Sequence, residues 1–131
     1  MQKKHSANMK FKLLGLAVLI LLLASCDSKT TLRFEISNDS NTRIDSLRLI
    51  PSGYESDYYI SIAPNMTKEY IMDMTDIAKV DGDYQIDYIK NLNMRISKTF
   101  GYYTNGYPIE SLIKVSIKPD TILFDSELNR Y

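Results

Sequence analysis

The chain has 131 residues, of which 16 are lysine or arginine and 16 are aspartate or glutamate, so its formal charge is zero. It contains a single cysteine, Cys26, and a single histidine, His5. One cysteine excludes an intrachain disulfide, and one histidine leaves too few of the usual ligands for a zinc or copper site. The charge balance lacks the excess of basic residues that nucleic-acid binding requires.

The N-terminal segment has the pattern of an export signal. A basic stretch, Lys10-Phe11-Lys12, precedes an apolar run from Leu13 to Leu23. The eleven residues of this run fall short of the ~20 that cross a bilayer as a permanent helix. A membrane-anchoring helix is the alternative, but no basic stop sequence follows the run. Translation could begin at Met1 or at Met9, and both starts retain the pattern.

The apolar run ends in Leu23-Ala24-Ser25-Cys26, which resembles the lipobox of bacterial lipoproteins. The resemblance covers residues 1–26 only. It implies that residues 1–25 are a signal peptide, cut between Ser25 and Cys26, and that the Cys26 sulfur carries a diacylglyceryl group. Fatty acyl chains such as palmitate would then hold the protein to a membrane.

Removal of residues 1–25 would leave 106 residues, enough for one compact domain. Four of the basic residues and none of the acidic ones lie in the removed part, so 12 basic residues would face 16 acidic ones. This mildly acidic remainder again argues against nucleic acid as a partner. It has no histidine and no free thiol, which excludes Ser-His-Asp and Cys-His triads. Carboxylates, tyrosine and lysine could still catalyse a reaction, but no catalytic motif accompanies them, and we expect no enzyme and no cofactor.

Residues 26–31 are polar and without periodicity, as expected for a short lipidated tether. Asp27 supports two opposite interpretations. In lipoproteins of enteric type, an aspartate after the cysteine favours the inner membrane, whereas other Gram-negative groups use acidic residues near this position for surface export. We expect an anchor in the outer membrane, on its periplasmic or its surface face, in preference to the inner membrane.

From Leu32 onward the chain alternates between apolar and polar residues, which predicts a strand over 32–36. A turn follows at 38–41, and a second strand runs to Pro51. In a regular strand, Ile44 would face the opposite side from Leu47 and Leu49, because its number is even and theirs are odd. One extra residue near Asp45-Ser46 would keep all three on the core face. We therefore predict a β-bulge there.

Two further runs, 58–62 and 68–74, predict strands on either side of Ala63-Pro64-Asn65. Their proximity predicts an antiparallel hairpin. Residues 73–79 have too little periodicity for a helix, and we expect a crossover loop.

The clearest strand begins after Asp81-Gly82 and places Tyr84, Ile86 and Tyr88 on one face. Tyr84 resembles the tyrosine corner of immunoglobulin-like sandwiches, although Ile86 stands where those domains have a cysteine. This likeness is one of architecture and implies no function.

Extended runs at 94–103, 109–117 and 121–124 complete the pattern, and Asn105-Gly106 predicts a type I′ hairpin turn after the first of them. In total we expect seven or eight short strands with turns between them and no long helix. The predicted fold is all-β, an antiparallel β-sandwich over residues 32–131.

Tyrosines are concentrated around the Asn105-Gly106 turn. Tyr102, Tyr103, Asn105 and Tyr107 could form a binding tip for a protein or a sugar, because aromatic rings offer flat contact area and asparagine offers hydrogen bonds. The alternative is that tyrosine fills strand positions through its β propensity, with Tyr102 and Tyr103 pointing to opposite faces.

Aspartates gather between residues 73 and 87, and Asp76, Asp81 and Asp83 are the candidates for a Ca²⁺ site. No EF-hand spacing is present, and the alternative is an ordinary polar loop.

Two functions follow from these patterns. The first is a non-enzymatic, membrane-anchored lipoprotein that acts as an interaction or structural module of the cell envelope, with a protein partner there. The second is a cell-surface module that binds a glycan or small ligand through the tyrosine-rich hairpin.

Overall fold

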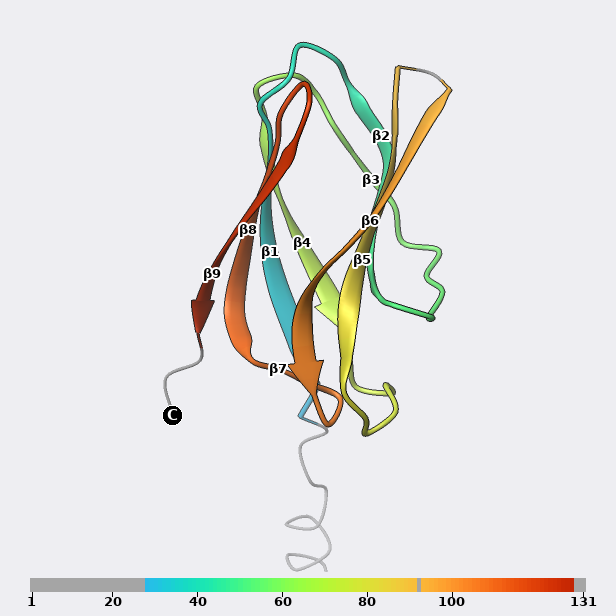
Figure 1. Cartoon of the computed structure of the whole chain (residues 1–131), viewed down its shortest axis with the longest axis vertical. Coiled ribbons are helices and arrows are strands. Elements are labelled where there is room, and N and C mark those ends of the chain that lie inside the picture. The colour runs from blue at the N-terminus through green and yellow to red at the C-terminus, as the bar shows by residue number, and fades with distance from the viewer. Residues whose placement is uncertain (1–27, 92, 129–131) are drawn as a thin grey trace, which may run out of the picture.

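A computed structural model describes residues 28–91 and 93–128, which form two β-sheets packed face to face (Figure 1). One sheet has four strands in the order β4-β1-β8-β9, and the other has five in the order β3-β2-β5-β6-β7. The strands are β1 (Thr31–Asn38), β2 (Ile44–Pro51), β3 (Ile60–Ile62), β4 (Thr67–Asp73), β5 (Gly82–Lys90), β6 (Met94–Thr104), β7 (Tyr107–Pro108), β8 (Glu110–Ile117) and β9 (Ile122–Leu128).

The all-β sandwich predicted from the alternation is confirmed, with nine strands in place of seven or eight. No helix among the described residues is long and apolar enough to cross a membrane.

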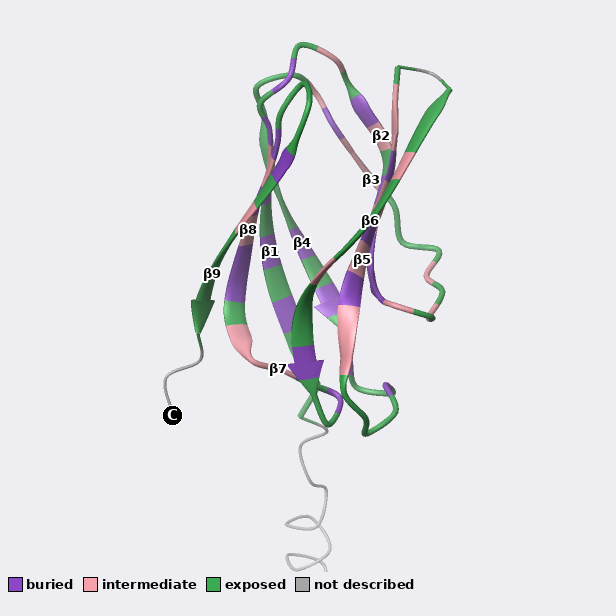
Figure 2. Ribbon diagram, in the orientation of Figure 1, coloured by how far each residue is buried: buried purple, intermediate pink, exposed green. Residues whose placement is uncertain are grey.

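The core lies between the two sheets. Buried and exposed residues alternate along β1, so that Leu32, Phe34 and Ile36 are fully covered, and Figure 2 shows the alternation as changing colour along the ribbon. Phe34 makes edge-on contacts with Tyr70 from its own sheet and Tyr84 from the opposite sheet, at 6.4 and 6.2 Å between ring centroids. Burial of one such side chain stabilises the fold by roughly 1.5–3 kcal/mol, so these aromatic contacts help to hold the two sheets together.

The predicted bulge in β2 is confirmed. The pairing register shifts between Ile44 and Leu47 on the β3 side and between Asp45 and Arg48 on the β5 side. Ser46 has a φ of 49°, in the left-handed region. The extra residue lets Ile44 and Leu47 both face the core, which is why the change of spacing in the sequence was informative.

The predicted hairpin between residues 58–62 and 68–74 is wrong. β3 pairs with β2 in the five-stranded sheet, whereas β4 pairs with β1 in the four-stranded sheet. The buried side chain of Asn38 stabilises this crossing between the sheets, because its Nδ2 donates to the carbonyl of Ile62 at 3.0 Å. The backbone carbonyl of Asn38 accepts from the amide of Asn65 at 2.8 Å. The predicted strand also begins too early, since Tyr58 precedes β3 and is exposed.

The sheets are not wholly antiparallel, because β1 and β8 run parallel, with Arg33 opposite Leu112 and Asn38 opposite Ile117. The chain reaches β8 from β7 in the other sheet, so β8 enters the four-stranded sheet from the same end as β1 (Figure 1). The crossover predicted at 73–79 is confirmed: this segment links β4 to β5 in the opposite sheet and contains no helix.

Tyr84, Ile86 and Tyr88 are buried on one face of β5, as predicted. The hydroxyl of Tyr84 has no hydrogen-bond partner among the described residues, so the likeness to a tyrosine corner does not extend to its hydrogen bond. Burial raises the pKa of Tyr84 well above that of a free tyrosine.

Candidate functional site

The lipobox residues Ser25 and Cys26 lie outside the described residues. The described chain begins at Ser28, and residues 29–31 lie beside the β6–β7 hairpin, where they line a shallow hollow with Thr104, Asn105 and Tyr107. The tether therefore enters the domain at the end that carries the tyrosine-rich hairpin.

The hairpin turn has the conformation that its sequence predicts. Asn105 and Gly106 have φ angles of 50° and 73°, as a type I′ turn requires. The amide of Gly106 donates to the carbonyl of Val80 at 2.9 Å, and a Cβ at this glycine would lie 2.8 Å from the carbonyl oxygen of Ala78. The turn is thus packed against the β4–β5 crossover and is fixed in place.

The hairpin tyrosines do not act together. Tyr102 and Tyr107 are 47% and 49% exposed, but Tyr103 is only 2% exposed and belongs to the core. Its ring lies 5.5 Å from that of Tyr84 and fills the space that Gly82 leaves by having no side chain. Neighbouring strand residues face opposite sides of the sheet, and Tyr103 faces inward, so it does not lie on the exposed surface that the predicted binding tip requires.

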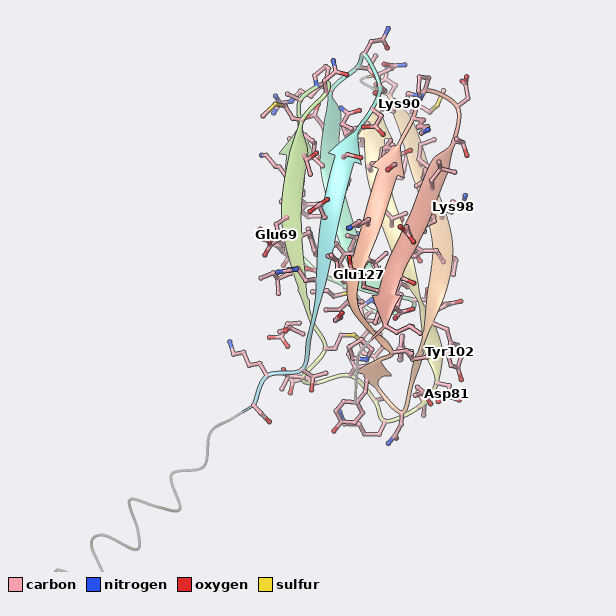
Figure 3. The ribbon with its side chains drawn as sticks, turned by 90° about the vertical axis from the view of Figure 1, so that its left-hand side faces the viewer. Glu69, Asp81, Lys90, Lys98, Tyr102 and Glu127 are labelled. Atoms are coloured by element: carbon pink, nitrogen blue, oxygen red, sulfur yellow. The ribbon has the colours of Figure 1, made fainter. Side chains whose placement is uncertain are left out.

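Asp81 organises the exposed side of the hairpin. Its carboxylate accepts hydrogen bonds from the Tyr102 hydroxyl at 2.6 Å, the Thr104 hydroxyl at 2.8 Å and the Asn105 amide at 2.9 Å. Figure 3 shows Asp81 and Tyr102 next to each other at this end of the sandwich. The hydrogen bond from Tyr102 is the main cause that lowers the pKa of Asp81, and the same bond raises the pKa of Tyr102. These polar groups stabilise the turn and are already engaged with one another.

The calcium candidates do not form a site. Asp81 is engaged with the hairpin, and Asp83 lies on β5, where its backbone carbonyl accepts from the amide of Ser52. Within residues 28–91 and 93–128, no three carboxylate, histidine or cysteine side chains are arranged to hold a metal ion. Proximity in sequence did not bring Asp76, Asp81 and Asp83 together, because the backbone between them crosses from one sheet to the other.

Comparison of the chain with protein-family models, with curated proteins and with solved structures finds no match.

A groove of about 770 Å³ lies at one side of the sandwich, between β4, the end of β2 and the segment that follows β2, and no pattern in the sequence indicated it. We call it the side groove. Its lining includes the apolar residues Leu49, Ile50, Pro51, Tyr54, Tyr58, Tyr70, Ile71, Met72 and Ile77, and the polar residues Glu55, Ser56, Glu69, Asp73 and Asp76. Four of these are carboxylates, and none is a lysine, an arginine or a histidine.

Arg48 links the segment 52–59, which forms one wall of the side groove, to the five-stranded sheet. Its guanidinium donates to Glu55 at 2.7 Å, to Asp87 at 3.0 Å and to the carbonyl of Ser56 at 3.3 Å. The Tyr59 ring lies 5.7 Å from the same guanidinium. The hydrogen bond with Glu55 is the main cause that raises the pKa of Arg48. A half-buried cation with several partners orders the segment 52–59, which has no regular secondary structure of its own after its opening turn.

Proposed function

We propose that this protein is a membrane-anchored lipoprotein of the cell envelope whose folded domain binds a protein partner and performs no chemistry. The lipobox resemblance at Cys26 supports the anchor, and the outer membrane is the expected location. The observation that carries the binding role is the side groove, an ordered hollow with an apolar floor and an acidic rim.

The length of the tether supports a position close to the membrane. β1 begins at Thr31, and an extended chain advances at most about 3.6 Å per residue, so Thr31 lies no more than roughly 18 Å from Cys26. The hairpin end of the domain would then face the lipid headgroups, while the sides of both sheets and the opposite end remain open to partners (Figure 1).

A glycan-binding role for the hairpin has less support. Only two of its three tyrosines are exposed, and one of them is hydrogen-bonded to Asp81. The other, Tyr107, is covered on one side by the Lys79 ammonium group, which lies 4.3 Å from its ring centroid. A glycan array with the wild type and Tyr107→Ser tests this role, and equal binding by both proteins would remove it.

The experiment for the proposed function uses the lipidated protein in its own envelope. Chemical crosslinking followed by affinity capture should recover a defined protein partner, and mass spectrometry of the N-terminal peptide should show acyl chains on Cys26. A Cys26→Ser variant should lose both the lipid and the membrane association. Retention of this variant in the membrane fraction would contradict the anchor, and absence of any crosslinked partner would contradict the binding role.

A further inference from the structure

Strand edges form the walls of the side groove. Five consecutive residues of β4, Glu69 to Asp73, line it, as do three consecutive residues of β2, Leu49 to Pro51. Side chains alternate between the two faces of a strand, so consecutive residues can line one hollow only where the strand presents its backbone edge. The groove therefore separates the edge of β4 in one sheet from the edge of β2 in the other.

Both edges are open here for a structural reason. β3 has only three residues and pairs with β2 at Ile44 and Leu47, so no strand of the described part of the chain lies beside the second half of β2 on that side. The carbonyl of Leu49 is satisfied instead by the hydroxyl of Tyr70, at 3.1 Å. β4 pairs with β1 on one side, and no strand of the described residues pairs with it on the other.

The charges around the side groove define what fits it. The floor contains the buried side chains of Leu49, Met72 and Ile77. The rim carries four carboxylates; that of Glu55 is already paired with Arg48, and those of Glu69, Asp73 and Asp76 are exposed. An open strand edge takes up an extended segment by backbone hydrogen bonds, with side chains on alternate positions directed to the floor and to the rim. Apolar side chains suit the floor, and lysine or arginine suits the rim.

We propose that the side groove binds an extended segment of a partner protein, which lies along β4 and alternates apolar residues with lysine or arginine. The inference rests on the proposed function only in taking the partner to be a protein, and it does not depend on the lipid anchor. Five residues of β4 give a contact about 16 Å long at the usual rise per residue of a strand. The acidic rim disfavours a second copy of this chain, because its β4 offers one lysine, Lys68, beside two carboxylates, Glu69 and Asp73.

The test uses the full-length protein in detergent and two fluorescent heptapeptides, one alternating valine with lysine and one alternating valine with glutamate. Fluorescence anisotropy at low ionic strength should show binding of the lysine peptide at least tenfold tighter than that of the glutamate peptide. Hydrogen exchange of the wild type should slow at residues 69–73 when the lysine peptide is bound, and not along β9, the other edge of the same sheet.

A matched pair of variants separates the groove from general charge attraction. Glu69→Lys with Asp76→Lys reverses two exposed carboxylates of the rim, and Asp120→Lys with Asp125→Lys reverses two exposed carboxylates elsewhere. The rim variant should bind the lysine peptide at least tenfold more weakly than the wild type does, whereas the affinity of the control variant for this peptide should change less than threefold. Equal weakening by the two variants, no preference for lysine over glutamate, or the absence of protection at residues 69–73 would each overturn the inference.

The two proposals fail separately. If the envelope crosslinking captures a partner through another face while the lysine peptide does not bind, the result contradicts the side-groove inference and supports the binding role. If the crosslinking captures no partner while the peptide protects β4, the groove stands as a peptide site and the proposed envelope role falls.

Discussion

The hydroxyl of Tyr102 donates a 2.6 Å hydrogen bond to the carboxylate of Asp81, 21 residues earlier in the chain. Asp81 also accepts from Thr104 and Asn105, so a single carboxylate links the start of β5 to the end of β6 and to its turn. Tyr102, one of the two exposed tyrosine candidates for ligand binding, thus stabilises the fold locally.

Asp81→Asn should make the protein less stable at neutral pH and less sensitive to acid. The hydrogen bonds lower the pKa of Asp81 below its ordinary value of 3.8, so the charged carboxylate favours the folded state above that pH. This contribution disappears as the pH falls through the lowered folded-state pKa. Urea unfolding should therefore separate the variant from the wild type at about pH 6, and the difference should shrink at about pH 2.

The control for this prediction is Asp120→Asn, which removes an exposed carboxylate from the turn between β8 and β9. It should leave the unfolding midpoint at pH 6 nearly unchanged. If Asp81→Asn and Asp120→Asn behave alike at both pH values, the three hydrogen bonds of Asp81 do not stabilise the folded state.

Local chemistry made several features predictable. The Asn105-Gly106 turn follows from the need for two positive φ angles, and the bulge at Ser46 follows from the shift in apolar spacing. Alternation identified the strands but not their partners. The sequence could not show that β3 and β4 belong to different sheets, or that β1 and β8 run parallel, because these pairings depend on contacts far apart in the chain.

The candidate site was less predictable for a related reason. Alternation places Tyr102 and Tyr103 on opposite faces, but it does not say which of them faces the core. The side groove comes from two strand edges in different sheets, and its residues are spread from Leu49 to Ile77. The exposed Glu69, Ile71 and Asp73 of β4 were visible in the pattern only as the outer face of a strand.

Tyr70 and Tyr84 should respond in opposite ways to loss of the hydroxyl. The hydroxyl of Tyr70 donates to the backbone carbonyl of Leu49 and lies 3.2 Å from the backbone carbonyl of Tyr58. The hydroxyl of Tyr84, in contrast, is buried without a hydrogen-bond partner among the described residues. Tyr70→Phe should lower the free energy of unfolding by about 1–3 kcal/mol, because it leaves a carbonyl unsatisfied. Tyr84→Phe should leave stability unchanged or raise it, because an uncompensated polar group is removed from the core. Chemical denaturation of both variants checks this, and a larger loss for Tyr84→Phe would show that its hydroxyl has a partner.

Alanine should destabilise the protein for different reasons at Gly82, where there is no room for a side chain, and at Gly53, where the backbone φ is positive. A Cβ on Gly82 would lie 2.4 Å from the hydroxyl oxygen and 2.5 Å from the Cζ of Tyr103, a core residue. Gly82→Ala should therefore destabilise the protein by about 1–3 kcal/mol through overpacking. Gly53 has a φ of 86° and nothing within 4 Å of its Cβ position, so Gly53→Ala should cost only about 1 kcal/mol in backbone strain. Thermal unfolding of the two variants gives the comparison, and Gly82→Ala with no loss of stability would mean that Tyr103 can move away.

Glu69 should favour binding in the side groove at a cost in stability. It lies directly opposite Glu35 in the β1–β4 ladder, and like charges in such a pair are destabilising. Glu69→Gln should raise the free energy of unfolding by a few tenths to about 1 kcal/mol. Glu35→Gln should change the free energy of unfolding less, because Glu35 also lies beside Lys114 of β8 and its removal loses an attraction as well as a repulsion.

The same Glu69→Gln variant should bind the valine-lysine peptide more weakly, since the rim loses one of its four carboxylates. A double-mutant cycle with Glu35 measured by urea unfolding, together with peptide anisotropy, tests both effects. A variant that gains stability and keeps full peptide affinity would show that Glu69 takes no part in recognition.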